Sequence, residues 1–230
     1  FTSISAYTKT NLTHSYDGDW ANDQYWYSNH GFDSQVEGWS YEFFDRNDKE
    51  RKSTSQDFRL SFHDLILGVF YKNLIESDEA NGYLFGGLSN SAKSQYDFGV
   101  YSGYFKYDWK INPKIKLTTN YRLEKNTIDY SGQSEGMDYY YYTIDLPNVK
   151  HSNSFFMNGY RASIIIKNTQ SLNYFGSIAK GYKSGGVNQQ PFINNKNRNY
   201  GPEELRTLEF GIKYFSDKIY TNINLFHGLR

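Results

Sequence analysis

The chain has 230 residues, and its 25 basic and 25 acidic side chains give a formal net charge of zero. No global field therefore favours nucleic acid or an anionic membrane surface as a partner. The absence of cysteine excludes disulfide scaffolds, thiol chemistry and cysteine-based zinc sites. By length alone, the chain could form one all-β domain.

The composition is too polar for an ordinary membrane protein and yet rich in aromatic residues, and a membrane β-barrel reconciles these two features. Only 38% of the residues are hydrophobic and the mean hydropathy is −0.77, yet 19% are aromatic. In a barrel only every second strand residue meets lipid, and aromatic girdles cover both membrane interfaces. No run of about 18 apolar residues is present, so no transmembrane helix is expected.

Period-two alternation of apolar and polar residues predicts about nine strands, several of them ten or more residues long. In chain order these cover 1–16, 57–62, 65–72, 101–109, 115–124, 160–166, 171–183, 208–214 and 219–225. A bilayer requires strands of about 9–11 residues, whereas soluble strands average about 5–6. The strand lengths therefore favour a barrel that spans a membrane.

The connections alternate between long and short. Long polar stretches cover 17–51, 77–94, 131–153 and 184–202, and tight turns fall at 63–64, 112–114, 168–170 and 216–218. This is typical of an antiparallel up-and-down meander whose long loops face a compartment that holds ligand. We predict an all-β, partial transmembrane β-barrel with long outer loops and short periplasmic turns.

The same alternation assigns side chains to two faces. It predicts that the apolar set meets lipid and that the charged set faces the lumen. The apolar set is Leu117, Tyr121, Ile164, Phe210 and Ile223, and the charged set is Arg122, Glu124 and Glu209. A soluble β-sandwich, propeller or carbohydrate-binding β-domain is the alternative fold, but it would leave the charged face no place except water.

Aromatic residues in the long polar stretches are the candidates for ligand contact. Tyrosine and tryptophan offer large amphipathic faces at low entropic cost, which suits capture of aromatic chelates or sugar rings. Packing of loop on loop, or a place in the interfacial girdle, is the alternative role for each of them. The candidates are Trp20, Tyr25, Trp26, Tyr27, Trp39, Tyr139 and Tyr141.

No residue pattern indicates an enzyme, a metal site or a cofactor. The five histidines lie too far apart for local metal-ligand spacing, and no Ser/His/Asp arrangement is evident. Glu209 on the inward face would need a hydrogen-bond donor, which Arg206 or an inward lysine could supply. We interpret it as a wall residue in a hydrated ladder of charges.

Two blocks of sequence resemble a known family. The segments are Lys180-Gly181-Tyr182-Lys183-Ser184-Gly185-Gly186-Val187-Asn188 and Tyr200-Gly201-Pro202-Glu203-Glu204-Leu205-Arg206-Thr207-Leu208-Glu209-Phe210-Gly211-Ile212-Lys213. Together they resemble the barrel of TonB-dependent outer-membrane receptors. The resemblance spans nearly all of 1–230 and implies part of a barrel domain. The family's plug domain, its transducer-binding box and its closing strand are expected to lie in a longer polypeptide.

The resemblance also implies a function and a set of partners. It implies a receptor in the bacterial outer membrane, surrounded by lipid, that imports a ferric siderophore or another scarce nutrient without transforming it. The inner-membrane energy transducer would act through the plug. Cobalamin, haem or an oligosaccharide are the other ligand classes. A passive porin or a surface adhesin on a similar meander is the alternative function.

Overall fold

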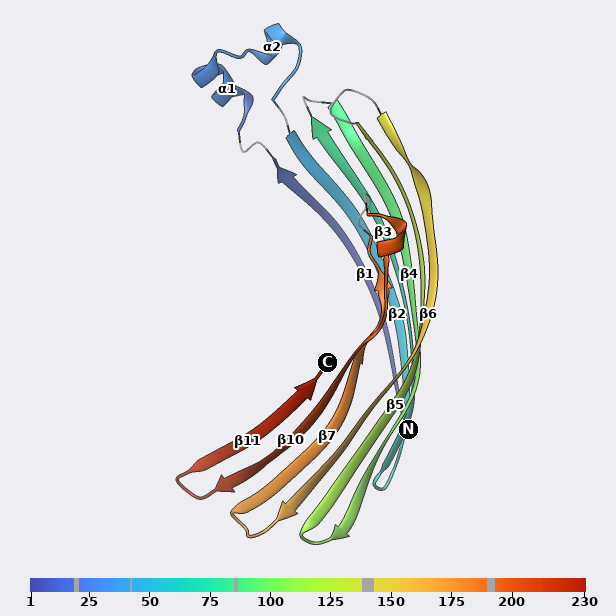
Figure 1. The fold of residues 1–230 in the computed structure, drawn as a ribbon, viewed down its shortest axis with the longest axis vertical. Helices are drawn as coiled ribbons and strands as arrows, with labels where there is room; N and C mark the ends of the chain where they lie inside the picture. Colours follow the sequence, from blue (N-terminus) through green and yellow to red (C-terminus); the bar gives the residue numbers. More distant parts are fainter. Residues whose placement is uncertain (19–20, 42, 85–86, 138–142, 190–192) are drawn as a thin grey trace.

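Nine long strands form one antiparallel sheet in which each strand pairs with its neighbour along the chain (Figure 1). The computed structural model describes residues 1–18, 21–41, 43–84, 87–137, 143–189 and 193–230. The strands of the sheet are β1 (Thr2–Asp17), β2 (Phe43–Phe62), β3 (Leu65–Leu84), β4 (Gly87–Asn112), β5 (Ile115–Met137), β6 (Thr143–Lys167), β7 (Leu172–Lys183), β10 (Glu203–Phe215) and β11 (Tyr220–Leu229).

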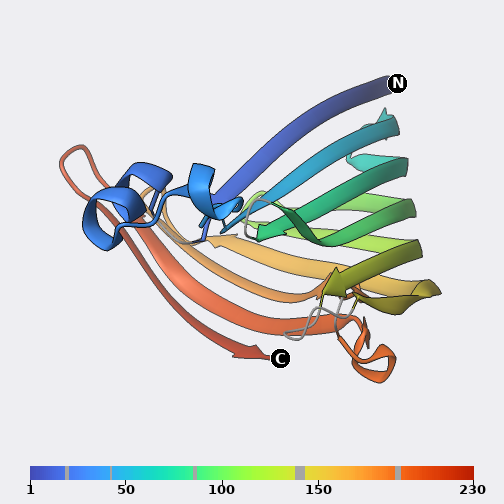
Figure 2. The same cartoon turned by 90° about the horizontal axis from the view of Figure 1, so that it is seen from above.

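The sheet has the predicted meander order, interrupted only by a small insertion between β7 and β10. That insertion holds a two-stranded ribbon of β8 (Gly186–Val187) and β9 (Asn199–Tyr200), with the short 3₁₀ helix η1 (Asn195–Asn197) between them. Seen from above, the sheet follows an arc, and β1 and β11 are its two free edges (Figure 2). The predicted partial antiparallel barrel is confirmed.

Cross-strand register separates an apolar face from a polar one, because residues directly opposite in an antiparallel pair share a face. Leu117 lies opposite Ile164, and Phe210 lies opposite Leu225, all on the first face. Arg122 and Glu124 alternate with Tyr121 and so lie on the second. We define the apolar band as the first-face side chains of 58–62, 65–71, 101–109, 117–123, 156–166, 174–178, 208–214 and 223–225.

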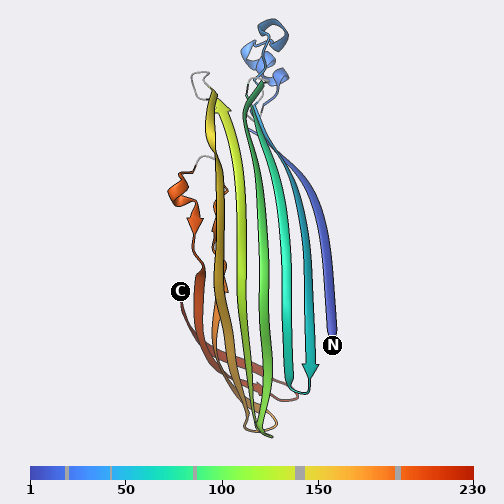
Figure 3. The ribbon, with the colours of Figure 1, turned by 90° about the vertical axis from the view of Figure 1, so that its right-hand side faces the viewer.

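Tight turns close one rim of the sheet at all four predicted places (Figure 3). Asn112 caps its turn by accepting hydrogen bonds at Oδ1 from the backbone amides of Lys114 and Ile115, both at 2.9 Å. The Thr169 hydroxyl accepts from Ser171 and Leu172 in the same way. His63 takes a left-handed backbone with φ 51°. These local contacts let successive long strands reverse within a few residues.

At the other rim the strands continue far beyond the apolar band. β4 has 26 residues and β6 has 25, more than twice the length that a bilayer requires. The stretches 77–94 and 131–153, which alternation marked as long loops, are paired strand over most of their described length. Water contacts both faces of the sheet at this level, so neither face requires apolar residues. The sequence therefore lacks the alternation typical of a strand, although backbone pairing continues.

Two segments remain outside the sheet at this rim. Residues 18–42 carry α1 (Asp23–His30) and α2 (Ser34–Glu37), and residues 184–202 carry the small ribbon. A hydrogen bond of 2.7 Å from the Gly18 amide to the Phe43 carbonyl closes the base of the first segment. No helix in the described part of the chain is long and apolar enough to cross a membrane.

Candidate ligand-binding face

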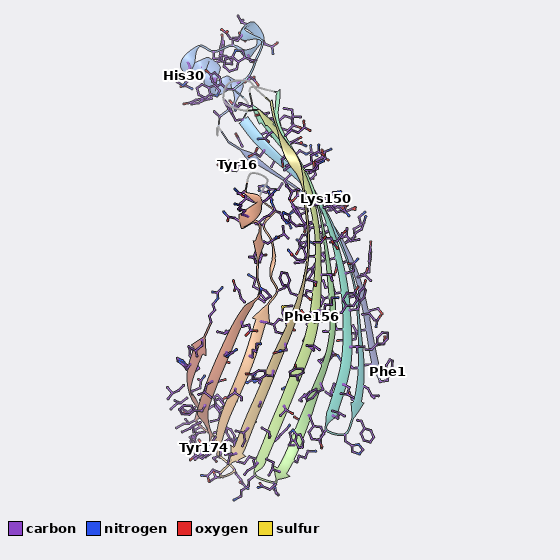
Figure 4. All side chains as sticks on the ribbon, turned by 45° about the vertical axis from the view of Figure 1, so that its right-hand side comes forward. Phe1, Tyr16, His30, Lys150, Phe156 and Tyr174 are labelled. Atoms are coloured by element: carbon purple, nitrogen blue, oxygen red, sulfur yellow. The ribbon has the colours of Figure 1, made fainter. Side chains whose placement is uncertain are left out.

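Segment 184–202 folds back onto the polar face of the sheet, and that face is the concave one (Figures 1 and 4). Val187, only 5% exposed, packs against Ile128 and Tyr130, which are buried on the polar face of β5. Tyr96, Phe98, Val149 and Phe155 complete this cluster. The alternating aromatics on the polar strand faces therefore form a seat for the segment, which sequence reasoning had missed although the period-two signal was present.

Arg198 holds the segment in its folded shape. Its side chain is 1% exposed, and its guanidinium donates to the carbonyls of Asn188 and Ile193, both at 3.0 Å. A third bond of 3.3 Å goes to Asn195 Oδ1, and the guanidinium carbon lies 6.0 Å from the centre of the Tyr130 ring. Three charge-assisted bonds satisfy a cation that would otherwise be expensive to bury. Residues 184–202 thus form a fixed projection on the concave face, which we call the ledge, and we call the sheet behind it the wall.

The glycine pair of the ledge is required by close packing rather than by backbone angles. Positive φ occurs among the described glycines only at Gly31 and Gly38, so neither Gly185 nor Gly186 supplies a left-handed conformation. A Cβ on Gly185 would lie 2.5 Å from the Tyr200 carbonyl oxygen and 2.7 Å from Phe155 Cζ. Gly185 therefore lets the ledge approach the wall closely.

A small polar hollow of about 280 Å³ lies between the ledge and the wall. Asn47, Asp78, Ser94, Tyr130, Ser134 and Gln189 contribute its hydrogen-bonding groups. The Tyr130 hydroxyl donates to the Gln189 carbonyl at 3.2 Å, so the wall and the ledge are joined directly at this point. The hollow offers both donors and acceptors within a volume that suits one small polar group of a ligand.

Charged side chains near the hollow pair with one another. Lys49 lies 3.0 Å from Asp78 and 3.4 Å from Glu76, and Arg51 also pairs with Glu76. On the opposite face of the same strands, Lys52 and Lys9 donate to Glu50, and these bonds lower the pKa of Glu50 to about 2. The extended strands therefore carry cross-strand ion pairs on both faces, as expected for a wall standing in water.

A second network lies lower on the concave face, at the level of the apolar band. Tyr104 donates to Asp57 at 2.6 Å, and Arg59 reaches the same carboxylate at 2.5 Å. The Tyr104 ring lies over Gly68, where a Cβ would come within 2.2 Å of it. Arg122 lies 5.4 Å from the centre of the Phe70 ring, which links these residues to the neighbouring strand.

Arg122 and Glu124 continue this network across β5. Arg122 donates to Glu124 through Nε at 2.8 Å and through Nη2 at 2.6 Å, and the Tyr182 hydroxyl donates to the same carboxylate at 3.2 Å. Glu209 also lies on the concave face, but its donor is Asn224 at 2.9 Å. The expected donor Arg206 points to the other face and pairs with Glu204, so that expectation was wrong.

The first segment folds into a compact aromatic cap. At the N-terminus of α1 the Asn22 side chain accepts a hydrogen bond from the Tyr25 amide. At the N-terminus of α2 the Asp33 side chain accepts one from the Gln35 amide. Trp26 stacks on Tyr41 with ring centres 4.2 Å apart. Trp39 packs against Tyr41 at 4.7 Å and against Phe32 at 4.6 Å. Two of the predicted ligand-binding tryptophans, Trp26 and Trp39, are thus half-buried and pack against other rings of the cap.

The remaining aromatic candidates are divided between the exterior of the cap and residues that are not described. Tyr25 is 48% exposed and Tyr27 is 60% exposed. Trp20, Tyr139 and Tyr141 lie outside the described residues. A hollow of about 680 Å³ opens between the cap and the ends of β1 and β2, lined by residues that include Tyr16, Asp17, Asn22, Asp23, Tyr41 and Phe44. No group of potential metal ligands is present in the described part of the chain.

Comparison with known proteins assigns the family. The model of the TonB-dependent receptor-like β-barrel matches residues 2–228, so the chain belongs to this family of outer-membrane receptors. The family consists of transport receptors rather than enzymes, and its members reside in the bacterial outer membrane, where we place this chain. No curated protein matches the chain in sequence.

The same fold is found in a solved structure. The ferric yersiniabactin uptake receptor FyuA from Yersinia pestis superposes with a TM-score of 0.69 at 11% identity, covering 98% of this chain and 32% of its own. The ferric-catecholate import receptor Fiu from E. coli gives 0.49 at 15% identity, covering 81% and 32%. The siderophore receptor PiuA from Acinetobacter baumannii gives 0.48 at 14%, covering 97% and 36%. The chain spans about a third of the length of these proteins.

Proposed function

We propose that the chain forms the ligand-receiving wall of a receptor for energy-coupled uptake of a ferric siderophore or a similar scarce nutrient. One observation carries the proposal: the rim with the long connections bears both a folded aromatic cap and a ledge fixed on the concave face. The concave face would line the lumen, with Arg122, Glu124 and Glu209 facing the plug. A ligand entering from outside would meet the cap and the ledge first.

The chemistry of the two elements suits a chelate with rings and oxygen atoms. Exposed Tyr25 and Tyr27 offer flat surfaces on the cap, and the hollow beside Tyr130 offers a carboxylate, amides and hydroxyls. Ferric siderophores combine such features. A plug and the inner-membrane transducer would supply gating and energy, as the resemblance to the family implies, and an open pore without them would be a porin.

Growth under iron limitation tests the proposal. The full-length receptor should restore growth on at least one ferric siderophore from a panel, and a strain that requires cobalamin should be run in parallel to separate the ligand classes. Uptake of the ferric siderophore by these cells should depend on the proton gradient across the inner membrane. Uptake that persists after this gradient is dissipated would indicate a passive porin and contradict the proposal.

The structure also defines which deletion to make. Shortening 20–48 would remove six residues of β2. Replacing 21–41 by a short linker between Gly18 and Phe43 keeps their 2.7 Å hydrogen bond and all paired strand. Ligand binding should be lost while membrane insertion is kept, because exposed connections tolerate deletion better than strands do. Undiminished growth would mean that recognition lies elsewhere.

A further inference from the structure

The convex face of the sheet carries a groove within the apolar band, on the side away from the proposed ligand-binding face. Two adjoining hollows of about 480 and 490 Å³ make up this groove, and they share Phe58, Val69 and Gly103. Most of the lining residues come from β2, β3 and β4. The first hollow also reaches Leu123 on β5 and Phe156 on β6, and the second reaches Tyr121 on β5. The surface is apolar along most of its length, as a lipid-facing surface must be.

Gly103 creates the groove because it removes a side chain from the middle of the band. It lies opposite Val69 on one strand and Leu123 on the other, and a Cβ at this position would meet nothing within 4 Å. Aromatic pairs protrude on either side of this gap along the strands. Tyr71 and Tyr101 lie 5.2 Å apart above it, and Phe105 and Tyr121 lie 6.1 Å apart below it.

A lysine lies at the upper end of the groove. Lys125 lies opposite Tyr101 and Phe156, on the side of the long connections, and its ammonium is 5.4 Å from the centre of the Phe156 ring. Among the described residues Lys125 forms no ion pair. All the other residues that line the first hollow are uncharged. An exposed cation at the edge of an apolar band fits the depth of lipid headgroups.

We propose that this groove binds a phosphorylated lipid of the outer leaflet, with one acyl chain in the gap at Gly103 and a phosphate beside Lys125. Lys125 and Tyr121 are four residues apart on β5, which corresponds to about 13 Å of strand. A groove of this length accommodates a substantial part of an acyl chain. The unpaired ammonium supplies charge complementarity to a phosphate. The walls of protruding rings suit a narrow chain better than the flat surface of a second barrel.

Lipid binding by the full-length receptor tests this assignment. Native mass spectrometry of the purified receptor, titrated with bisphosphorylated lipid A, should show a saturable bound lipid. Gly103→Leu fills the gap and should weaken binding at least tenfold. Gly176→Leu is the matched control, because Gly176 lies on the same face and a Cβ there makes only ordinary contacts of 3.6 Å or more. Equal binding by wild type and Gly103→Leu would overturn the proposal.

The headgroup contact has its own test. Lys125→Gln should weaken binding of bisphosphorylated lipid A at least threefold and leave binding of dephosphorylated lipid A unchanged. Equal losses for both lipids would refute the phosphate contact. Heat-modifiable gel migration verifies folding, and Gly103→Ala, which should give an intermediate loss, serves if the leucine variant does not fold. If Gly103→Leu instead converts a dimer to a monomer at constant lipid content, the groove holds a second copy and the lipid proposal is wrong.

Discussion

Arg122 donates two hydrogen bonds to a single carboxylate oxygen of Glu124, two residues further along β5. Glu124 is 8% exposed, and Tyr182 donates to the same oxygen. Glu124→Gln removes the charge that all three bonds share, so it should lower the free energy of unfolding by about 1–3 kcal/mol. Urea titration of the full-length receptor in lipid vesicles, followed by tryptophan fluorescence, measures this change.

The control for that measurement is Glu79→Gln. Glu79 pairs with Lys93 on the extended part of the wall, and both side chains are about half exposed or more. An exposed pair of this kind contributes about 0–1 kcal/mol, so the variant should stay close to wild type. If Glu79→Gln proved as costly as Glu124→Gln, the concave-face network would have no special role in stability.

The two faces of β6 should respond differently to a new charge. Ile164 lies in the apolar band, whereas Ser163 lies on the concave face. An arginine on the lipid face costs about 2–4 kcal/mol at the bilayer midplane and about 0–1 near the interfaces. Because Ile164 is three residues from the end of β6, we expect about 1–2 kcal/mol for Ile164→Arg. Ser163→Arg, measured in the same vesicles, should cost less. The reverse order would contradict the assignment of faces.

Arg198 should hold the ledge in place without contributing much to the stability of the barrel. Arg198→Met removes the donors to Asn188, Ile193 and Asn195 and should release residues 184–202 from the wall. Limited proteolysis of the full-length receptor should then cleave within this range at least tenfold faster, while the unfolding midpoint of the barrel changes little. Lys196→Met, at an exposed position of the same segment, is the control. Equal cleavage rates for the two variants would refute the anchoring role.

Alanine substitutions in the GYKSGG block should separate two glycines that look alike in sequence. Gly185→Ala forces a Cβ against the Tyr200 carbonyl and the Phe155 ring, and overpacking of this kind costs about 1–3 kcal/mol. Gly181→Ala adds a Cβ that meets nothing within 4 Å, so its effect should be within about 0.5 kcal/mol. Hydrogen exchange of the ledge amides would report the local loss. A protected ledge in Gly185→Ala would count against close packing.

Acidification should remove the contribution of Glu50. Its pKa, lowered to about 2 by the bonds from Lys52 and Lys9, lies below the usual value of about 4.3 in an unfolded chain. The stabilisation is therefore fully present above the unfolded value and is lost as the pH falls toward 2. Urea midpoints of wild type and Glu50→Gln should differ slightly at pH 5 and converge below pH 2. A difference that grows on acidification would contradict this sign.

Sequence periodicity located the part of the sheet that meets lipid, because one face there must be apolar while the other is not. The same signal is absent where β2–β6 stand in water, and so the strands of 77–84 and 143–153 read as loops. Alternation placed Glu209 on the face opposite its neighbours Leu208 and Phe210, as the structure has it. It could not identify Asn224 as the hydrogen-bond donor, because that contact depends on how β10 pairs with β11. The role of Arg198 depends on a tertiary fold of residues 184–202 that no local pattern encodes.

Strand pairing beyond the apolar band has a consequence for how such a receptor could change its ligand. Residues within β2–β6 are locked in register, so an inserted residue would displace every cross-strand partner above it. Segments 18–42 and 184–202 carry no such constraint on length. Ligand selectivity should therefore change by exchange of these two segments while the sheet stays constant. A chimera that receives both segments from a receptor of different selectivity should acquire the ligand preference of that receptor.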